Sequence, residues 1–186
     1  NVSIASPLRW DPFPQSSDRS DWLSGLSTIA TNGNAALQLG GAVHHYVAAL
    51  SMVDTVFVNT DGELMFVPYE GALLLKSEMG DLEVSPGDLA VIPRGVKFSV
   101  DLAASHARGY VCENYGEAFR LPESGLMGIN TNASARDFEF PLASFDNTER
   151  STRIVTKMTG KFFETEIPHS PLDVVAWHGN LAPYRY

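Results

Sequence analysis

The chain has 186 residues, of which 44% are hydrophobic and 19% charged, as in ordinary globular proteins of one or two domains. Its net charge is −9, and because no basic stripe is present to neutralise a phosphate backbone, we expect no nucleic-acid partner. No apolar run approaches the roughly 18 residues of a membrane span, and the first residues lack the order of a signal peptide, so we expect no membrane partner.

Residues 1–41 are rich in proline, glycine, asparagine and serine, and we expect a loop-rich N-terminal segment that packs on the core. Residues 42–186 have a different texture, in which short apolar runs alternate with turn signals. We expect them to form one β domain with little helix. The runs of strand length are VHHYVAAL, TVFVN, ELMFVPYEGALLL, LAVIP, VKFSVDL and RGYVCENY. Tight reversals are expected at Asp61-Gly62 and Gly80-Asp81.

The clearest strand pattern covers Val96–Leu102, where apolar and polar residues alternate strictly. This period of two predicts a half-buried strand with Phe98 on its buried face. Farther along, RIVTKMTGKFFETEI predicts a hairpin that turns at Thr159-Gly160, while residues 121–140 have the composition of an irregular stretch. The predicted class is all-β, a barrel or jelly roll.

The segment PGDLAVIPRGVKFSVDL, residues 86–102, resembles the motif that closes a cupin half-barrel. Gly87, Pro93 and Gly95 stand at the expected spacing, and a metal-binding cupin would have histidine where this chain has Phe98. The resemblance narrows the fold to a cupin-like jelly-roll β-barrel or sandwich. Because a phenyl ring has no lone pair for a metal, Phe98 favours a packed interior.

The earlier half of the cupin pattern is also altered. Aligned backwards from Gly71, its two histidines fall near Phe57 and Asn59, and its acidic residue near Glu63 or Leu64. We therefore expect a packed scaffold, and a metal-free ligand pocket is the alternative.

The five histidines form no chelating pair in the sequence. His44 and His45 are adjacent, so in a strand they point to opposite faces. His106, His169 and His178 are isolated, with His178, in AWHGN, the best candidate for a role beyond structure. No residue of this chain is assigned a catalytic, cofactor-binding or metal-binding role.

Other reactive side chains have simpler interpretations. The single cysteine, Cys112, favours a reducing compartment, hence a cytoplasmic protein, and is expected to be a small core residue. Arg94, Lys97 and Arg108 are interpreted as a solvated basic rim, and a carboxylate-binding site is the less favoured alternative. Asp88 is interpreted as a turn cap in preference to a catalytic base.

The chain as a whole resembles the homogentisate 1,2-dioxygenase family. The likeness runs in order through SPLRWDPFP (6–14), LSGLSTIATNGN (23–34), NTDGELMFVPYEGALLLKSEMGDLEVSPGDLAVIPRGVKFSVD (59–101), RGYVCENYGEAFRLPESGLMGIN (108–130), ARDFEFP (135–141) and DVVAWHGNLAPYRY (173–186). It implies an enzyme that opens the ring of homogentisate with O2 to give maleylacetoacetate, in tyrosine and phenylalanine catabolism. It also implies a non-haem Fe(II) held by two histidines and a glutamate, and trimers paired into hexamers.

The resemblance covers the N-terminal, cupin-like part of the family, whose iron ligands lie downstream of the WHGN stretch. It therefore implies that this chain is the scaffold part of a longer polypeptide, inactive alone, with the C-terminal catalytic domain as its partner. A separately encoded relic is the alternative. A metal-free cupin module for a small acidic ligand and a purely structural assembly domain are the competing functions. The aromatic residues near the termini, Trp10, Phe13, Trp177, Tyr184 and Tyr186, suit docking faces or closure of the core.

Overall fold

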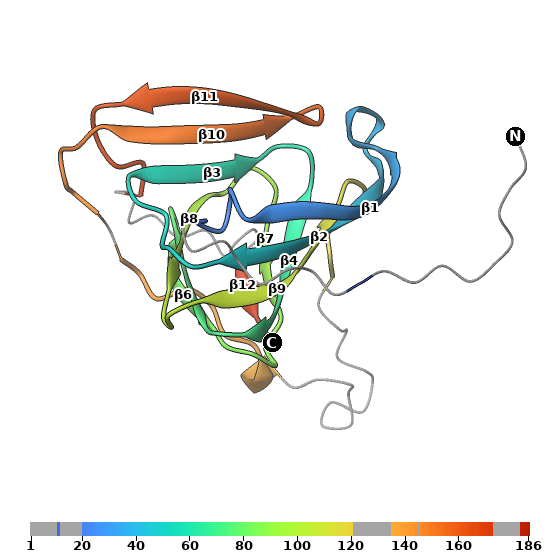
Figure 1. The fold of residues 1–186 in the computed structure, drawn as a ribbon, viewed down its shortest axis with the longest axis horizontal. Helices are drawn as coiled ribbons and strands as arrows, with labels where there is room; N and C mark the ends of the chain where they lie inside the picture. The colour runs from blue at the N-terminus through green and yellow to red at the C-terminus, as the bar shows by residue number, and fades with distance from the viewer. Residues whose placement is uncertain (1–10, 12–19, 121–134, 145, 173–182) are drawn as a thin grey trace, which may run out of the picture.

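The computed structural model describes residues 11, 20–120, 135–144, 146–172 and 183–186, and these ranges are the described part of the chain. They form two six-stranded sheets that face each other (Figure 1). In the first sheet the order is β1 (Leu26–Asn34), β2 (Leu39–Ala48), β9 (Ala107–Asn114), β4 (Glu63–Glu70), β7 (Ala90–Ile92) and β12 (Tyr184–Arg185). In the second it is β11 (Lys161–Ile167), β10 (Thr152–Met158), β3 (Thr55–Asn59), β8 (Lys97–Leu102), β5 (Leu73–Ser77) and β6 (Gly80–Val84).

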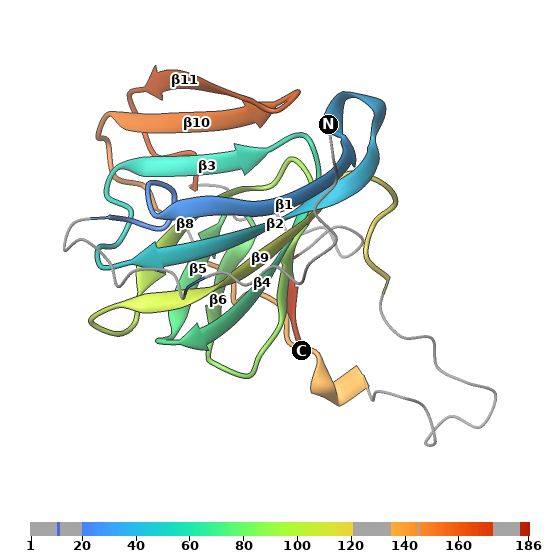
Figure 2. The same cartoon turned by 45° about the vertical axis from the view of Figure 1, so that its right-hand side comes forward.

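Eight of these strands form a jelly roll. Counted from β2 to β9 in chain order, the first, eighth, third and sixth strands form one sheet, and the second, seventh, fourth and fifth form the other. This is the double Greek-key order of the jelly roll, and it confirms the predicted fold class. The remaining strands extend the sheets: β1 pairs with β2, and the β10–β11 hairpin lies beside β3 (Figure 2). The short strand β12 pairs with β7.

The expectation of a loop-rich segment over residues 1–41 is wrong for its second half. Leu26–Asn34 is strand β1, and β2 already begins at Leu39, so the expected boundary at residue 41 cuts through a strand. Gly33 and Gly40, both with positive φ, frame the hairpin loop, so the turn formers belong to a β-hairpin. Because nearly all of β1 is exposed, it has no buried face to give a period of two. Residues 1–10 and 12–19 lie outside the described part.

Helix within the described residues is limited to two 3₁₀ turns, η1 (Ala35–Leu37) and η3 (Ala135–Asp137), as expected. None of it is long and apolar enough to cross a membrane. Most of the stretch expected to be irregular, residues 121–134, lies outside the described part. The predicted hairpin at Thr159-Gly160 is confirmed, with β10 and β11 in antiparallel register from Met158↔Lys161 onward.

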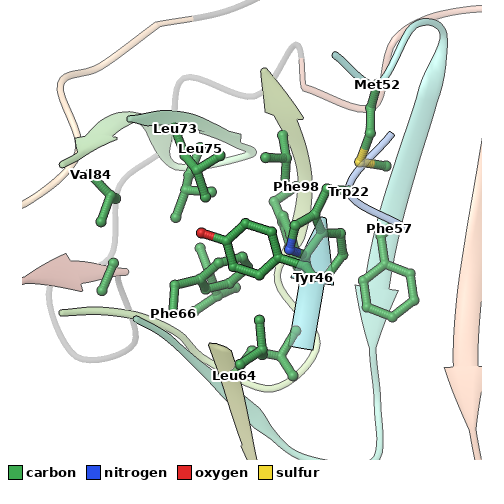
Figure 3. Packing of buried hydrophobic residues seen from close by; sticks show 14 of the residues in the cluster. Trp22, Tyr46, Met52, Phe57, Leu64, Phe66, Leu73, Leu75, Val84 and Phe98 are labelled. Carbon is green, nitrogen blue, oxygen red and sulfur yellow. The ribbon is translucent and has the colours of Figure 1, made fainter. Parts of the chain in front are cut away.

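Aromatic side chains fill the space between the sheets (Figure 3). The indole of Trp22 lies between 5.3 and 5.7 Å from the rings of Phe57, Phe66 and Phe98. All four side chains are 98% or more buried, and each removes on the order of 150–250 Å² from water, so this cluster is the main source of core stability. Aliphatic residues from both sheets surround it, among them Leu64, Leu73, Leu75, Val84, Val100 and Val111.

Candidate functional site

Phe98, and Phe57 near which the cupin alignment places a histidine, form a packed aromatic pair. Phe57 of β3 and Phe98 of β8 are directly opposite in neighbouring antiparallel strands, with ring centroids 5.7 Å apart and planes at 87°. Edge-to-face pairs of this kind are favourable, and neither ring offers a metal a lone pair. The prediction that Phe98 lies on the buried face is confirmed.

The other two positions do not complete a metal site either. Leu64 faces the interior and is 4% exposed, so its neighbour Glu63 is directed to the opposite face of β4, where its carboxylate accepts a hydrogen bond from the backbone N–H of Phe119 at 2.6 Å. Burial raises the pKa of Glu63. Asn59 donates to a carboxylate of the chain itself. This donor set does not fit an iron ion, and within the described part no three His, Cys, Asp or Glu side chains are grouped to hold a metal.

The carboxylate that Asn59 reaches is the centre of a buried polar cluster, which we define as Glu113, His44, Asn59 and Lys157. Oε1 of Glu113 accepts from Asn59 Nδ2 at 2.6 Å, and Oε2 is bonded to His44 Nε2 at 3.0 Å. Lys157 Nζ donates to the same Oε2. The side chain of Glu113 has no exposed surface, so its charge is balanced entirely by these partners.

Electrostatics keep Glu113 ionised near neutral pH. Burial disfavours its charge, but the hydrogen bonds from His44, Lys157 and Asn59 outweigh burial and lower its pKa to about 2. Burial and the neighbouring anion raise the pKa of Tyr115 to about 12, and the ring of Tyr115 lies 5.7 Å from Lys157 Nζ. A carboxylate so strongly acidic is a poor general base near neutral pH, so this cluster is unsuited to proton transfer.

The polar cluster joins the two sheets. Glu113 and His44 belong to β9 and β2 of one sheet, and Asn59 and Lys157 belong to β3 and β10 of the other. Close by, the carboxylate of Asp61 accepts from the backbone N–H groups of Thr159 at 2.5 Å and Gly160 at 2.8 Å. These bonds fix the turn of the β10–β11 hairpin over the end of the jelly roll. Thr159 has a positive φ of 51°, which costs energy outside glycine and is held here by the paired carboxylate.

A cavity of about 390 Å³ lies beside the polar cluster. Its apolar wall includes Trp22, Leu26, Phe57, Leu64 and Phe162, and its polar wall includes the cluster, Thr28 and Tyr115. His44 is fixed from the other side by Thr28, whose Oγ1 lies 3.0 Å from Nδ1. Because the charge of Lys157 is already balanced by Glu113, this wall has no spare positive charge for an anionic ligand.

The structure separates the histidines as expected. His44 points into the jelly roll, whereas His45 points out, with its Nε2 2.8 Å from the hydroxyl of Tyr69. Burial lowers the pKa of His45. His106 lies 2.6 Å from Glu70 at the surface, and His169 is exposed. His178 lies outside the described part, as do Trp10, Phe13 and Trp177.

The remaining candidates lie in separate places. Arg94 donates to the backbone carbonyls of Tyr115 and Gly116, Lys97 pairs with Glu78, and Arg108 pairs with Glu70, so the three bases form no common carboxylate site. Asp88 accepts from the backbone N–H of Ser85 at 2.8 Å, which confirms its role as a turn cap.

Cys112 was expected in the core, but it is half-buried. Its neighbour Val111 occupies the inward face of β9 and is fully buried, so Cys112 lies on the outward face. Burial raises the pKa of its thiol. Of the terminal aromatics, Tyr184 and Tyr186 pack against Phe138, with ring centroids 6.4 and 5.2 Å away.

Sequence reasoning missed the pairing of Glu113 with Lys157. A signal was present, since Glu113 alternates with Val111 and Lys157 with Val155, so each charge lies on the apolar face of its strand. A charged residue at such a position is normally paired. The pattern does not say with which residue, because the two are 44 positions apart.

Comparisons with known proteins give consistent names. A family model described as homogentisate 1,2-dioxygenase N-terminal matches residues 1–186. Proteins named homogentisate 1,2-dioxygenase from Rhodopseudomonas palustris strain TIE-1 and Bradyrhizobium diazoefficiens are each 49% identical over 179 residues, and one from strain BisB18 is 51% identical. Each alignment covers 96% of this chain and 40% of the relative, so the chain spans about 40% of the length of these relatives.

Solved structures give a more distant likeness. A cupin-2 domain containing protein from Shewanella frigidimarina is 17% identical with a TM-score of 0.41, covering 52% of this chain and 83% of that one. An oxalate decarboxylase of Bacillus subtilis is 11% identical with a TM-score of 0.37, covering 56% of this chain and 32% of that one.

Proposed function

This chain belongs to the homogentisate 1,2-dioxygenase N-terminal family, and on that premise we propose that it is the scaffold part of an enzyme that cleaves the ring of homogentisate with O2. The product is maleylacetoacetate, in cytoplasmic tyrosine and phenylalanine catabolism. The observation that carries this proposal is the 49% identity, over 96% of the chain, to relatives with that name.

The proposal assigns the chemistry to another part of the polypeptide. Fe(II), which supplies the open coordination positions for substrate and O2, is held by two histidines and a glutamate beyond this chain. The side chains inside the jelly roll support this division. Phe57 and Phe98 offer a metal no lone pair, and the Glu113 carboxylate is already bonded to Asn59 and Lys157. The role left to the jelly roll is to provide a rigid body that positions the catalytic part and excludes water.

The partners in this proposal are the C-terminal catalytic domain and further copies of the same chain in a trimer or hexamer. Support comes from the length of the relatives, of which this chain covers 40%. The long exposed edge strand β11, with Phe162 57% exposed and Phe163 46% exposed, is the kind of surface that full-length proteins cover.

The test compares the full-length protein with residues 1–186 produced alone. The full-length protein is expected to retain about one Fe per chain and to consume O2 with homogentisate. Residues 1–186 are expected to retain no stoichiometric iron and to consume no O2. Tight equimolar Fe(II) binding by residues 1–186, lost on His178→Ala, would defeat the division of roles.

The competing function, a metal-free module for a small acidic ligand, predicts a different result. It requires residues 1–186 alone to bind homogentisate or benzoate in calorimetry. We expect no such binding, because Lys157, the cation beside the cavity, is neutralised by Glu113.

A further inference from the structure

The outward faces of the two sheets differ in chemistry. In the second sheet, the outward positions of β5, β6 and β8 are mostly polar: Lys76, Asp81, Glu83, Lys97, Ser99 and Asp101. In the first sheet, the outward positions of β2, β4 and β9 are mostly apolar or aromatic. We define them as the outer apolar face: Val43, Val47, Met65, Val67, Tyr69, Tyr110 and Cys112. These strands are hydrogen-bonded neighbours, so the face is contiguous (Figure 2).

The outer apolar face remains open in the described part of the chain. Its aromatic end holds Tyr69 and Tyr110, with ring centroids 5.6 Å apart, and these residues are 47% and 40% exposed. At the opposite end Val43 is 37% exposed, and a hollow of about 340 Å³ has Val43 and Cys112 in its lining. Contiguous apolar patches open to solvent are uncommon on monomeric proteins, and they mark interaction surfaces.

The charged groups at the aromatic end are engaged with one another. Glu70 lies 3.7 Å from Arg108 and 2.6 Å from His106, and the imidazole of His45 is bonded to Tyr69. A partner therefore meets this face chiefly through apolar contact. Interfaces of that character are typical of permanent associations, since transient ones are more polar.

The direction of β12 indicates which partner covers the face. β12 belongs to the same sheet and runs parallel to β4, because both strands pair antiparallel with β7. Tyr184 is level with Met65 in this register, and the backbone of Tyr186 exchanges two hydrogen bonds of 2.8 Å with Leu89. β12 is therefore directed towards the end of the sheet that carries Tyr69, roughly 10 Å from β4 at the usual strand spacing.

We propose that the outer apolar face is the docking surface for the C-terminal part of the same polypeptide. This inference rests on the proposed function, which places that part beyond residues 1–186. The matched family model is described as N-terminal and the chain covers 40% of its relatives, so their remaining length supplies a partner of sufficient size. A partner joined through β12 is held at a high effective concentration beside the face, and its association is permanent.

The experiment is photo-cross-linking in the full-length protein, with p-benzoylphenylalanine in place of Tyr110. We expect a product with the mass of one chain, in which position 110 is joined to a peptide beyond residue 186. The same replacement of Leu74, on the outward side of β5, is the matched control and should give no such peptide. A product with the mass of two chains would assign the face to a second copy. That result, cross-links confined to residues 1–186, or no cross-link overturns the proposal.

Consumption of O2 with homogentisate, measured on the full-length protein before irradiation, separates this inference from the proposed function. A cross-link to a peptide beyond residue 186 in a protein that consumes no O2 supports the docking surface and contradicts the proposed activity. Consumption of O2 by a protein that gives no such cross-link overturns the docking surface alone.

Labelling of Cys112 by N-ethylmaleimide gives a second readout, because this thiol lies on the outer apolar face. In the full-length protein, Val67→Lys places a charge within the interface and should raise the rate at which native Cys112 is labelled roughly tenfold. Leu74→Lys places the same charge on the outward side of β5 and should leave that rate unchanged. Equal labelling rates in the two variants would contradict coverage of the face.

Discussion

Lys157 of β10 and Glu113 of β9 form an ion pair between the two sheets, although 44 residues separate them along the chain. The pair depends on the parallel alignment of β10 with β3, which places Lys157 beside Asn59 in the register. Both side chains then reach the same carboxylate. The Lys157–Glu113 ion pair thereby attaches the hairpin to the jelly roll. Because the Glu113 side chain is fully buried, water cannot replace Lys157 as its partner.

Removing Lys157 should therefore destabilise the protein strongly. Lys157→Met leaves the buried Glu113 carboxylate with only His44 and Asn59 as partners. We therefore expect the free energy of unfolding to fall by about 3 kcal/mol. The measurement is urea unfolding at pH 7. Lys161→Met, on the exposed strand β11, is the matched control and should change stability by less than about 0.5 kcal/mol.

The double variant Lys157→Met/Glu113→Gln distinguishes loss of the pair from loss of packing. Because it removes both charges, it should recover much of the stability that Lys157→Met loses. Equal stability of the single and double variants would contradict an energetically important ion pair.

The pH dependence of stability should show Glu113 directly. Its pKa is about 2 in the folded protein against an ordinary 4.5, so its contribution is complete above 4.5 and is lost as pH falls towards 2. We expect the free energy of unfolding to fall by roughly 3 kcal/mol from this group across that window. Glu113→Gln should flatten the acid limb in urea titrations, while Glu83→Gln should leave it unchanged. An unaltered acid limb in Glu113→Gln would count against the lowered pKa.

Phe98 should contribute to stability by filling the core, and histidine at this position should not create a metal site. Phe98→Ala should lower the free energy of unfolding by about 4 kcal/mol, and Phe98→Leu by only about 1–2 kcal/mol, because leucine refills most of the volume. In Phe98→His, an imidazole is buried among Trp22, Phe57 and Phe66, and a loss of about 3 kcal/mol is expected. Iron content after dialysis against Fe(II) should equal that of the wild type, and a gain of one Fe per chain would show that this position can still bind metal.

The hydroxyl of Tyr46 is a buried polar group that should not stabilise the fold. Its hydroxyl is fully buried and has no hydrogen-bond partner in the described part of the chain. Tyr46→Phe should therefore leave stability unchanged or raise it by about 1 kcal/mol. Tyr69→Phe is the matched control, because its hydroxyl is bonded to His45, and it should lose about 1 kcal/mol. Equal losses in thermal unfolding would indicate that Tyr46 has a partner, such as a bound water.

Several features were predictable because they rest on local chemistry. The alternation around Phe98 required one buried face, and the Thr159-Gly160 turn required a hairpin. The exposed strand β1 was not predictable in this way, since its residues follow the pairing with β2 and have no buried face of their own. The side of β9 on which Cys112 lies was likewise decided by the register with β2 and β4, which directs Val111 inward.

The sequence by itself determined the all-β class, the jelly-roll motif and the lack of metal ligands at Phe57 and Phe98. These features depend on residue identity and on alternation with a period of two, and both can be recognised within a short segment. Only the tertiary structure decided which charges meet. Glu113 and Lys157 are individually unfavourable on apolar faces, and they become favourable only when two sheets bring strands from distant parts of the chain within hydrogen-bonding distance.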